Sequence, residues 1–384
     1  ITLGITSVLY VLYGYGLVSG PSVKGWGLIG NPTDYIGLIN HQTDDGSGGT
    51  QVLYYAAWFI LFAAITVAIV ARGAARRMKF SAWLVFVPIW LTLVYFPVAH
   101  GVFTADTDDA RGGFLLNRIG IHDFAGGTAV HMNSGVAALA LALVLGARRK
   151  RMERPHNLPM VLLGGGILWF GWFGFNGSCA FGATFLTQFV ILNTLLAGSA
   201  GMIGFAIIEK IREGHVTSLG VITGVVAGLV GITPSANAVS SLGALGVGLL
   251  SSAVVAFLMS IKSRFKVDDS LDAFIVHGIG GIVGTLCIVL FAASSAPARL
   301  PRLLHAVDHH AALLGDVAAH LAHRLGVPVP PDDSGPGEGP LGKIVDGELV
   351  HALVPREEWR YPTFREGYDA LLADGFADSW VGRG

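Results

Sequence analysis

Apolar residues recur along the first three quarters of the chain in runs long enough to cross a bilayer. A helix needs about 20 largely apolar residues to span the hydrocarbon core. Nine stretches approach or exceed this length, near residues 1–19, 52–75, 81–103, 124–147, 158–180, 184–209, 217–236, 240–262 and 271–293. The runs are long and continuous rather than alternating, so they predict helices and not strands. We therefore expect an all-α polytopic membrane protein with about nine transmembrane helices.

Lys and Arg residues are concentrated in alternate loops between these stretches. The loops near 72–79, 148–154, 210–212 and 262–266 hold fourteen of the seventeen Lys and Arg that precede residue 296. Basic loops stay on the cytoplasmic side of a membrane. All nine spans then fit one orientation, with residue 1 inside and residue 293 outside.

The pattern changes after residue 293. Residues 296–384 hold 21 of the 51 charged residues, include the sequence PVPPDDSGPGEGP and contain no further span. We expect a membrane domain over 1–293 and a polar tail over 294–384, partly helical or disordered, on the outer side.

Composition narrows the class of function. The chain is 52% apolar and only 13% charged, against about 25% charged in soluble domains. Its formal net charge of −1 gives no sign of nucleic-acid binding. No nucleotide-binding, hydrolase or metalloprotease motif appears, so we expect no enzyme activity and no cofactor. Cys179 and Cys287 lie in apolar stretches, and neither is expected to form a disulfide.

Two histidines lie inside predicted spans, where a titratable side chain is costly and usually functional. His131 follows Asp123 by eight residues, and His277 follows Asp269 by the same interval. Asp123 is at an outer end and Asp269 at an inner end, which indicates an inverted repeat with paired sites near the midplane. Two imidazoles can line a narrow pore, but they do not make a metal site, which needs three or four ligands. The alternative is two hydrogen-bonded core histidines.

Near other span ends, His100 and His156 are expected at the membrane interface.

Several long motifs resemble the ammonium transporter family (Amt/Mep/Rh). They are DFAGGTAVHMNSGVAAL, RPHNLPMVLLGGGILWFGWFGFNGS, AGLVGITP and VDDSLDAFIVHGIGGIVGT, in this order within residues 1–293. The resemblance implies an eleven-helix subunit with two inverted halves, its own pore and a homotrimeric assembly in the plasma membrane. Relative to that fold we expect the chain to lack the first helix, part of the second, the last helix and the cytoplasmic C-terminal tail, on which a nitrogen-regulatory protein would dock.

The resemblance also implies roles for single residues. His131 and His277 match the twin pore histidines, and Phe62 and Phe175 match two stacked gate residues. Asp123 matches a carboxylate that shapes the ammonium recruitment site, although it is also placed as a helix N-cap. Asp269 matches an inner carboxylate that orients its helix, or is only a cap.

The recruitment site departs from the family pattern. Phe103 stands where the family often has Trp, which offers a stronger π-face to a cation. The family's hydroxyl falls on Cys179 in a gapless match, with Ser178 one place earlier. The sequence thus predicts ammonium transport through a bilayer-spanning pore, with deprotonation at the gate and passage of ammonia along the histidines. An ammonium sensor, a non-functional truncated family member and a transporter of another small cation remain alternatives.

Overall fold

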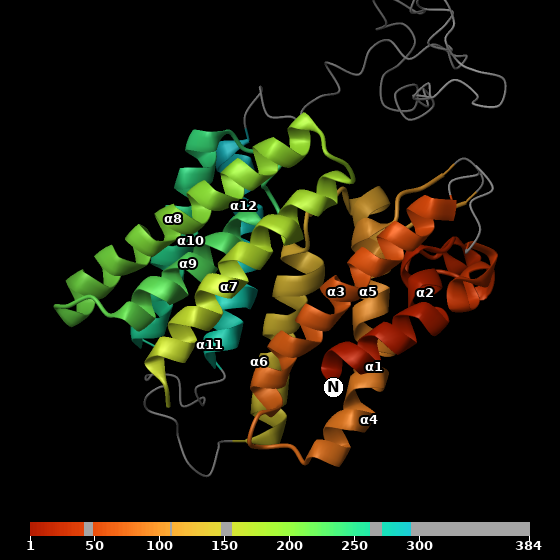
Figure 1. The fold of residues 1–384 in the computed structure, drawn as a ribbon, viewed down its shortest axis with the longest axis horizontal. Helices are drawn as coiled ribbons and strands as arrows, with labels where there is room; N and C mark the ends of the chain where they lie inside the picture. Colours follow the sequence, from red (N-terminus) through yellow and green to blue (C-terminus); the bar gives the residue numbers. More distant parts are fainter. Residues whose placement is uncertain (42–48, 108–109, 147–155, 262–270, 293–384) are drawn as a thin grey trace, which may run out of the picture. The chain divides into compact units, whose positions relative to one another are not determined.

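The computed structural model describes residues 1–41, 49–107, 110–146, 156–261 and 271–292, and the structural statements below concern this part of the chain. Asp269 and the predicted tail lie outside it. The helices, drawn in Figure 1, are α1 (Thr2–Leu9), α2 (Tyr15–Ser19), α3 (Gly49–Ala74), α4 (Phe80–Trp90), α5 (Phe96–Phe103), α6 (Asn133–Leu145), α7 (Leu158–Gly177), α8 (Phe185–Glu213), α9 (Ser218–Ile232), α10 (Ser241–Ile261), α11 (Leu271–Ala273) and α12 (Gly280–Phe291). Short π-helical turns join three pairs of them into longer rods, η1 (Tyr10–Gly14), η4 (Leu91–Tyr95) and η9 (Phe274–Ile279), and η6 (Gly127–Met132) leads directly into α6.

Each of the nine predicted stretches coincides with a helix, which confirms the all-α membrane fold. Eight helical rods are long and apolar enough to cross a bilayer: Thr2–Ser19, Val52–Ala74, Phe80–Phe103, Gly127–Leu145, Leu158–Ala180, Phe185–Glu213, Ser241–Ile261 and Phe274–Phe291. The stretch predicted at 217–236 contains the shorter helix α9, which ends at Ile232. Pro234 contributes to this end, because proline has no N–H and cannot donate the next helical hydrogen bond.

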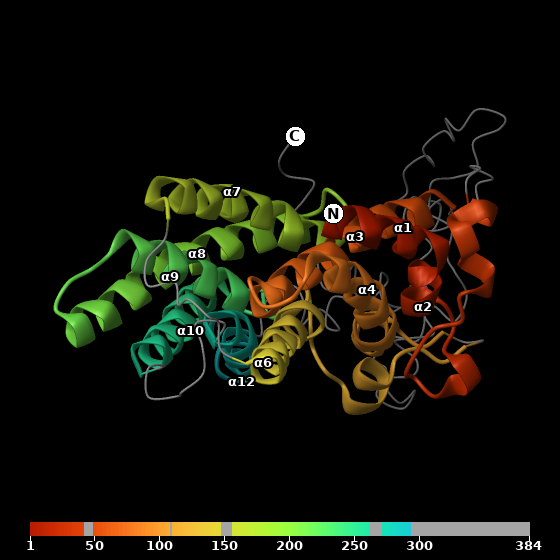
Figure 2. The same cartoon turned by 90° about the horizontal axis from the view of Figure 1, so that it is seen from below.

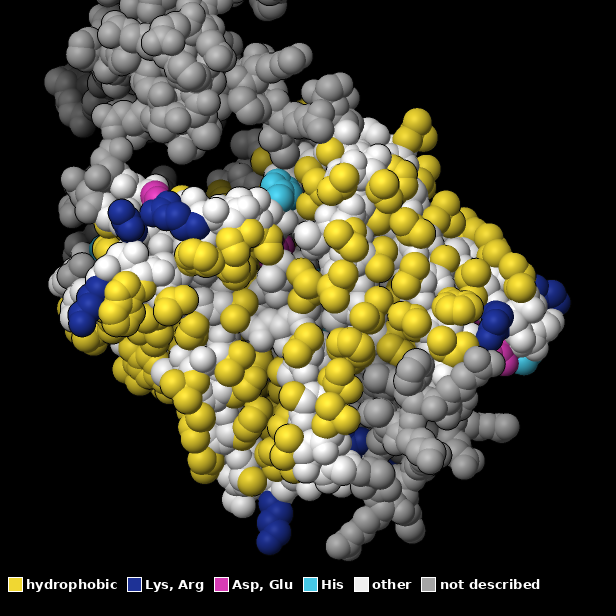
Figure 3. All heavy atoms as spheres, turned by 180° about the vertical axis from the view of Figure 1, so that it is seen from behind, with side chains coloured by type: hydrophobic (Ala, Val, Ile, Leu, Met, Phe, Trp, Pro, Cys, Tyr) yellow, Lys and Arg dark blue, Asp and Glu magenta, His cyan; other side chains and the backbone are white. Residues whose placement is uncertain are grey.

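One face of the molecule is continuously apolar. Figure 3 shows hydrophobic side chains across this face and the Lys and Arg side chains near its margins. Figure 2 shows α7 and α12 on opposite sides of the described helices, and apolar side chains are exposed on both: Phe170 of α7 is 78% exposed and Val289 of α12 is 84% exposed. In water such an apolar surface would promote aggregation, whereas in hydrocarbon it is the expected outer surface of a membrane protein.

Aromatic side chains join α1–α2 to α4–α5. The rings of Tyr10 and Phe96 meet edge to face with centroids 5.8 Å apart, and both side chains are fully buried. His100, predicted at the membrane interface, is also fully buried within the protein and does not reach its surface. Its Nδ1 lies 2.8 Å from the Val18 carbonyl oxygen. His100 therefore links α5 to α2, a contact that its position near a span end does not reveal.

Two rods cross at a glycine contact. In Figure 1, the rod of η6 and α6 runs in the opposite direction to the rod of α11, η9 and α12, as an inverted repeat requires. A Cβ atom added to Gly135 would lie 2.7 Å from the Cα atom of Gly278, too close for any side chain. The backbones can therefore approach directly, as small residues allow in membrane helices.

Asp123 caps the start of the first of these rods. One carboxylate oxygen accepts hydrogen bonds from the backbone N–H groups of Gly126 and Gly127, at 2.8 and 2.6 Å. The other accepts from Thr128 and Ala129, at 2.8 and 3.1 Å. These four donors have no partner within the helix, and a carboxylate there also complements the helix dipole. The predicted capping role of Asp123 is therefore present in the structure.

We predict that Gly135→Val lowers the stability of the protein in detergent. The added side chain would separate the two rods or distort them, at a cost of about 1–3 kcal/mol or more. Thermal unfolding of the purified protein measures this cost. Gly166→Ala is the matched control, because a Cβ there meets nothing within 4 Å. Equal unfolding temperatures for the two variants would show that the crossing tolerates a side chain.

Asp123→Asn is expected to destabilise the fold by about 1.5–3 kcal/mol, because charge-assisted hydrogen bonds are lost and an amide N–H₂ faces backbone donors. The control is Asp106→Asn, which removes a partly exposed ion pair with Arg118 and should change stability by about 0.5 kcal/mol or less. Both variants can be compared by the same unfolding assay. A loss no larger for Asp123→Asn than for Asp106→Asn would contradict the capping role.

Candidate functional site

The crossing of the two rods brings His131 and His277 into contact. Their Nδ1 atoms lie 3.3 Å apart, and their rings stack at a tilt of 29° with centroids separated by 5.3 Å. His131 is 1% exposed and His277 is half-buried. The sequence predicted that these residues pair, and the structure places them together although 146 positions separate them.

Both histidines lie in π-helical turns, which the sequence did not predict. His131 belongs to η6 and His277 to η9, each six residues long. The His131 N–H donates to the Gly126 carbonyl oxygen, five residues earlier, at 3.0 Å. Such turns rotate the following side chains around the helix axis and often occur at functional sites. The matched turns are a second sign of the repeat that the Asp–His spacing indicated.

The contact between two Nδ1 atoms has a chemical consequence. One Nδ1 must donate and the other must accept, so the neutral rings are in opposite tautomers. One ring then carries a proton on Nε2, and the Nε2 of the other is a free acceptor. The Nε2 of His131 is buried and has no hydrogen-bond partner in the structure. The pair can therefore offer both a donor and an acceptor to a small polar molecule without forming a charge.

Two aromatic rings stack beside this pair. The rings of Phe62 and Phe175 are tilted by 19°, with centroids 4.3 Å apart. The Phe175 ring centroid is also 6.2 Å from that of His131. Phe62 is 1% exposed, whereas Phe175 is half-buried. The two residues predicted as a gate thus lie face to face and adjoin the histidines.

Trp172 completes the wall around His131, and sequence reasoning missed it. Its ring stacks on the His131 ring with centroids 5.3 Å apart and a tilt of 23°. Its Nε1–H donates to the Thr233 hydroxyl at 3.0 Å, which fixes the orientation of the indole. Trp172 is three residues before Phe175, so both project from one face of α7. The three-residue interval between Trp172 and Phe175 is the feature of the sequence that could have identified Trp172 as part of this site.

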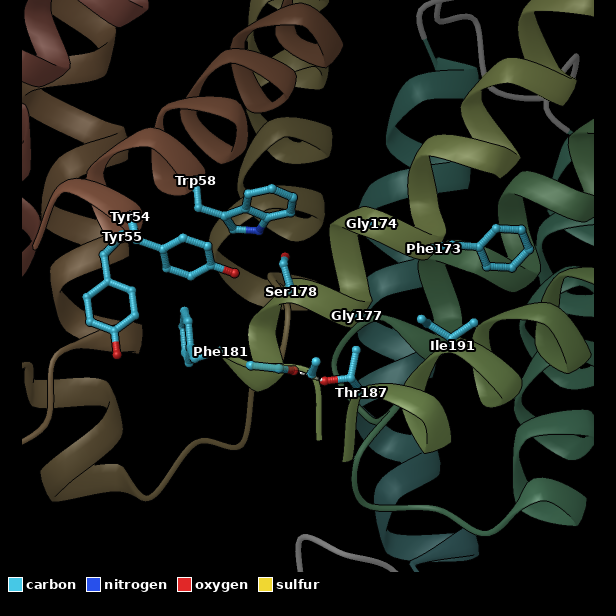
Figure 4. A pocket seen from close by; sticks show the side chains of 12 residues that line it. Tyr54, Tyr55, Trp58, Phe173, Gly174, Gly177, Ser178, Phe181, Thr187 and Ile191 are labelled. Carbon is cyan, nitrogen blue, oxygen red and sulfur yellow. Dashed lines mark hydrogen bonds between the residues drawn. The ribbon is translucent and has the colours of Figure 1, made fainter. Parts of the chain in front are cut away.

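An aromatic pocket opens on the predicted outer side of these rings. It has a volume of about 640 Å³ and is shown in Figure 4. It is lined by Tyr54, Tyr55, Trp58, Phe173, Gly174, Gly177, Ser178, Phe181, Gly182, Ala183, Thr187 and Ile191. Among the predicted recruitment residues, only Ser178 lines it, and its hydroxyl donates to the Phe175 carbonyl oxygen at 3.2 Å.

The other predicted recruitment residues lie deeper. The Phe103 ring meets Phe62 edge to face, with centroids 6.2 Å apart. Cys179 is 9% exposed, and its Sγ lies 3.4 Å from the Phe175 carbonyl oxygen. Asp123 holds the start of η6 through the four hydrogen bonds described above. Phe103 and Cys179 therefore adjoin the two rings predicted as a gate and do not line the open pocket.

A second cavity, of about 540 Å³, lies on the histidine side. His131, Trp172, Phe62 and Phe175 line one part of it, and the remainder extends along α3 and α7 to α1. Trp58 lines both this cavity and the outer pocket. Within the described residues no group of three His, Cys, Asp or Glu side chains could hold a metal ion, and both cysteines are free.

Comparisons with known proteins agree with this geometry. The sequence profile of the Ammonium Transporter Family matches residues 1–325. An ammonium transporter of Corynebacterium glutamicum is 51% identical over 299 residues, which are 77% of this chain and 66% of that protein. An ammonium transporter of Mycobacterium bovis is 44% identical over 316 residues, with the same coverage of 77% and 66%.

Solved structures show the same fold. The crystal structure of Saccharomyces cerevisiae Mep2 superposes with a TM-score of 0.68 at 33% identity, covering 76% of this chain and 66% of that one. A structure described as a sensor Amt protein gives a TM-score of 0.68 at 29% identity, over 77% and 73% of the two chains. The chain spans just under two thirds of the length of the two curated relatives. The extended sequence match, the inverted rods and the paired histidines place this multi-pass membrane protein in the ammonium transporter family.

Proposed function

We propose that the protein carries ammonium across the plasma membrane, releasing a proton near the gate and passing ammonia along the two histidines. The single observation that carries this proposal is the buried contact between His131 and His277 beside the stacked rings of Phe62 and Phe175. The relatives named as ammonium transporters support the substrate.

Physical chemistry favours ammonia over ammonium in this passage. A bare cation is very costly in an apolar environment, whereas a neutral molecule needs only hydrogen-bond partners. The step NH₄⁺ → NH₃ + H⁺ leaves the proton on the outer side of the gate. Ammonia has both donors and an acceptor, which match the protonated and unprotonated Nε2 atoms of the paired rings.

The gate residues have a separate role in this proposal. The stacked rings of Phe62 and Phe175 exclude water from the passage, so that proton release precedes entry. Asp123 keeps the start of η6 in place beside them, and Phe103 offers a π-face next to Phe62. Ser178 supplies a hydroxyl at the mouth. We also propose that the protein assembles as a homotrimer in which each subunit has its own pore.

A second candidate function is ammonium sensing. The similarity to the sensor Amt protein favours it, because the same fold and a large fraction of this chain are shared with that structure. A sensor would bind ammonium at the mouth and change its interaction with a partner without substantial flux. Flux therefore separates the two functions.

We predict that His131→Leu and His277→Leu together reduce ammonium-driven flux by about 5- to 150-fold, because removing hydrogen bonds from a polar molecule in an apolar passage costs about 1–3 kcal/mol. The measurement is alkalinisation of proteoliposomes by an imposed ammonium gradient, read with an internal pH dye and corrected for protein-free vesicles. Ammonia that enters without its proton raises the internal pH.

The matched control is His215→Leu, since His215 is exposed in the turn between α8 and α9. The control should conduct like the unaltered protein. Unchanged flux in the double variant would refute the role of the histidines. Ammonium binding by the unaltered protein without flux above protein-free vesicles would favour the sensor.

A further inference from the structure

We propose that the cavity between α3 and α7 is a lateral binding site for straight-chain primary alcohols dissolved in the bilayer. The hydrocarbon chain lies in the groove between the two helices, and the hydroxyl group hydrogen-bonds to the Nε2 atom of His131. The binding site follows from the cavity itself. Inhibition of ammonium flux by the occupant is a further consequence, which rests on the proposed transport function.

The cavity is a groove between two helix faces. Its lining on α3 runs from Trp58 to Ala68 at the three- and four-residue spacing of one face, and its lining on α7 runs from Gly164 to Phe175 at the same spacing. Gly164 and Gly171 both line it, and a Cβ atom added to either would meet nothing within 4 Å. Because these glycines have no side chains, the groove between the helices stays open.

Hydrocarbon surrounds this groove in a membrane. Both α3 and α7 are long and apolar enough to span a bilayer, and Figure 2 shows them with α1 along one side of the described helices. Only 6% of the apolar window of α7 is buried, against 33–44% in the other seven spans. Leu61 of α3 and Ile167 of α7, which line the groove, are 46% and 63% exposed. A ligand therefore reaches the groove from the bilayer.

Unpartnered polar atoms in the groove indicate what such a ligand carries. His131 lines the groove and is 1% exposed, yet its Nε2 atom has no hydrogen-bond partner in the structure. Trp58 also lines it, and the Nε1–H of its indole is buried without an acceptor. An unsatisfied polar atom in an apolar environment is costly, so a ligand that satisfies it gains binding free energy.

The chemistry of the imidazole selects a neutral hydroxyl group. The Nε2 of His131 donates in one tautomer of the pair and accepts in the other, and a hydroxyl can do both. A carboxylate only accepts, and an alkylamine is protonated at neutral pH, so either would bring a charge into an apolar groove. The cavity volume of about 540 Å³ is in the range of small-molecule sites, and a straight chain suits a groove that follows two helices.

An occupant of the groove would block the proposed passage from the side. The two rings predicted as a gate, Phe62 and Phe175, line the groove together with His131. A hydroxyl bound to Nε2 takes the hydrogen-bonding position that the proposed mechanism assigns to ammonia. We therefore expect the alcohol to lower ammonium flux without entering the outer pocket.

The probe is 3-azioctanol, a photoreactive analogue of 1-octanol, applied to the protein in liposomes. Labelled residues are mapped by mass spectrometry, with 1-octanol and octane as competitors at equal membrane concentration. We expect labels on the groove faces of α3 and α7, displaced about 2- to 12-fold more effectively by 1-octanol than by octane, which is the value of one hydrogen bond. Labels spread evenly over the exposed apolar residues, or equal displacement by the two competitors, would overturn the proposal.

Gly171→Leu is the variant that fills the groove, and Gly166→Leu is its matched control. Both glycines are exposed on α7 with nothing within 4 Å of an added Cβ, but only Gly171 lines the groove. We expect Gly171→Leu to weaken labelling of α3 by about 5- to 150-fold, because a side chain then competes for the occupied space. Gly166→Leu should leave the labelling unchanged, and thermal unfolding checks that both variants fold. Equal labelling of the two variants would contradict the site.

Photolabelling and flux fail independently. Labelling that falls in Gly171→Leu but not in Gly166→Leu supports the site even if no ammonium flux is found, and the absence of flux then counts against the transport proposal alone. A helix of a second copy seated in the groove would exclude the alcohol. Ammonium flux through an assembled protein whose groove stays unlabelled therefore counts against this site alone.

Discussion

The direct approach of two backbones at Gly135 and Gly278 is the constraint on which the rest of the site depends. The histidine side chains can share a hydrogen bond only because no side chain separates the rods that carry them. Isolated in hydrocarbon, each imidazole would be an unsatisfied polar group and a cost to the fold. In the pair, the two Nδ1 atoms share a hydrogen bond, and the Nε2 of His131 remains able to hydrogen-bond with another molecule. The same contact therefore lowers the energetic cost of burying the histidines and leaves them able to hydrogen-bond with a small molecule.

Asp123 shows how a polar group can support this crossing from a distance. Its carboxylate holds the four free N–H groups at the start of the rod that contains His131. The π-helical turn begins immediately afterwards and directs His131 towards its partner. A carboxylate near a predicted recruitment site invites interpretation as a direct cation ligand. Its four hydrogen bonds instead make Asp123 a structural anchor for the start of η6.

The aromatic side chains form a graded series along the proposed passage. Tyr54, Trp58 and Phe181 lie in the open pocket, and the stacked pair of Phe62 and Phe175 lies behind it. Trp172 then packs on His131. The exposed fraction of the side chains falls from 44% for Tyr54 to 1% for Phe62 and 5% for Trp172, so the energetic cost of a charge rises towards the histidines. Trp58 lines both the open pocket and the cavity beside His131, so an indole is present near the proposed mouth although Phe103 stands where the family often has Trp.

The sequence by itself determined the membrane fold, the positions of the helices and the identity of the histidine pair, because these depend on local composition and on spacing within a span. Long apolar runs must be helical in a bilayer, and a histidine within one needs a partner. The tertiary structure alone decided which side chains share a space. It buried His100 against the Val18 carbonyl, separated Ser178 in the open pocket from Cys179 in the packed wall, and brought Tyr55 beside Phe181. These outcomes depend on how helices rotate and cross, which is set by packing between segments far apart in the chain.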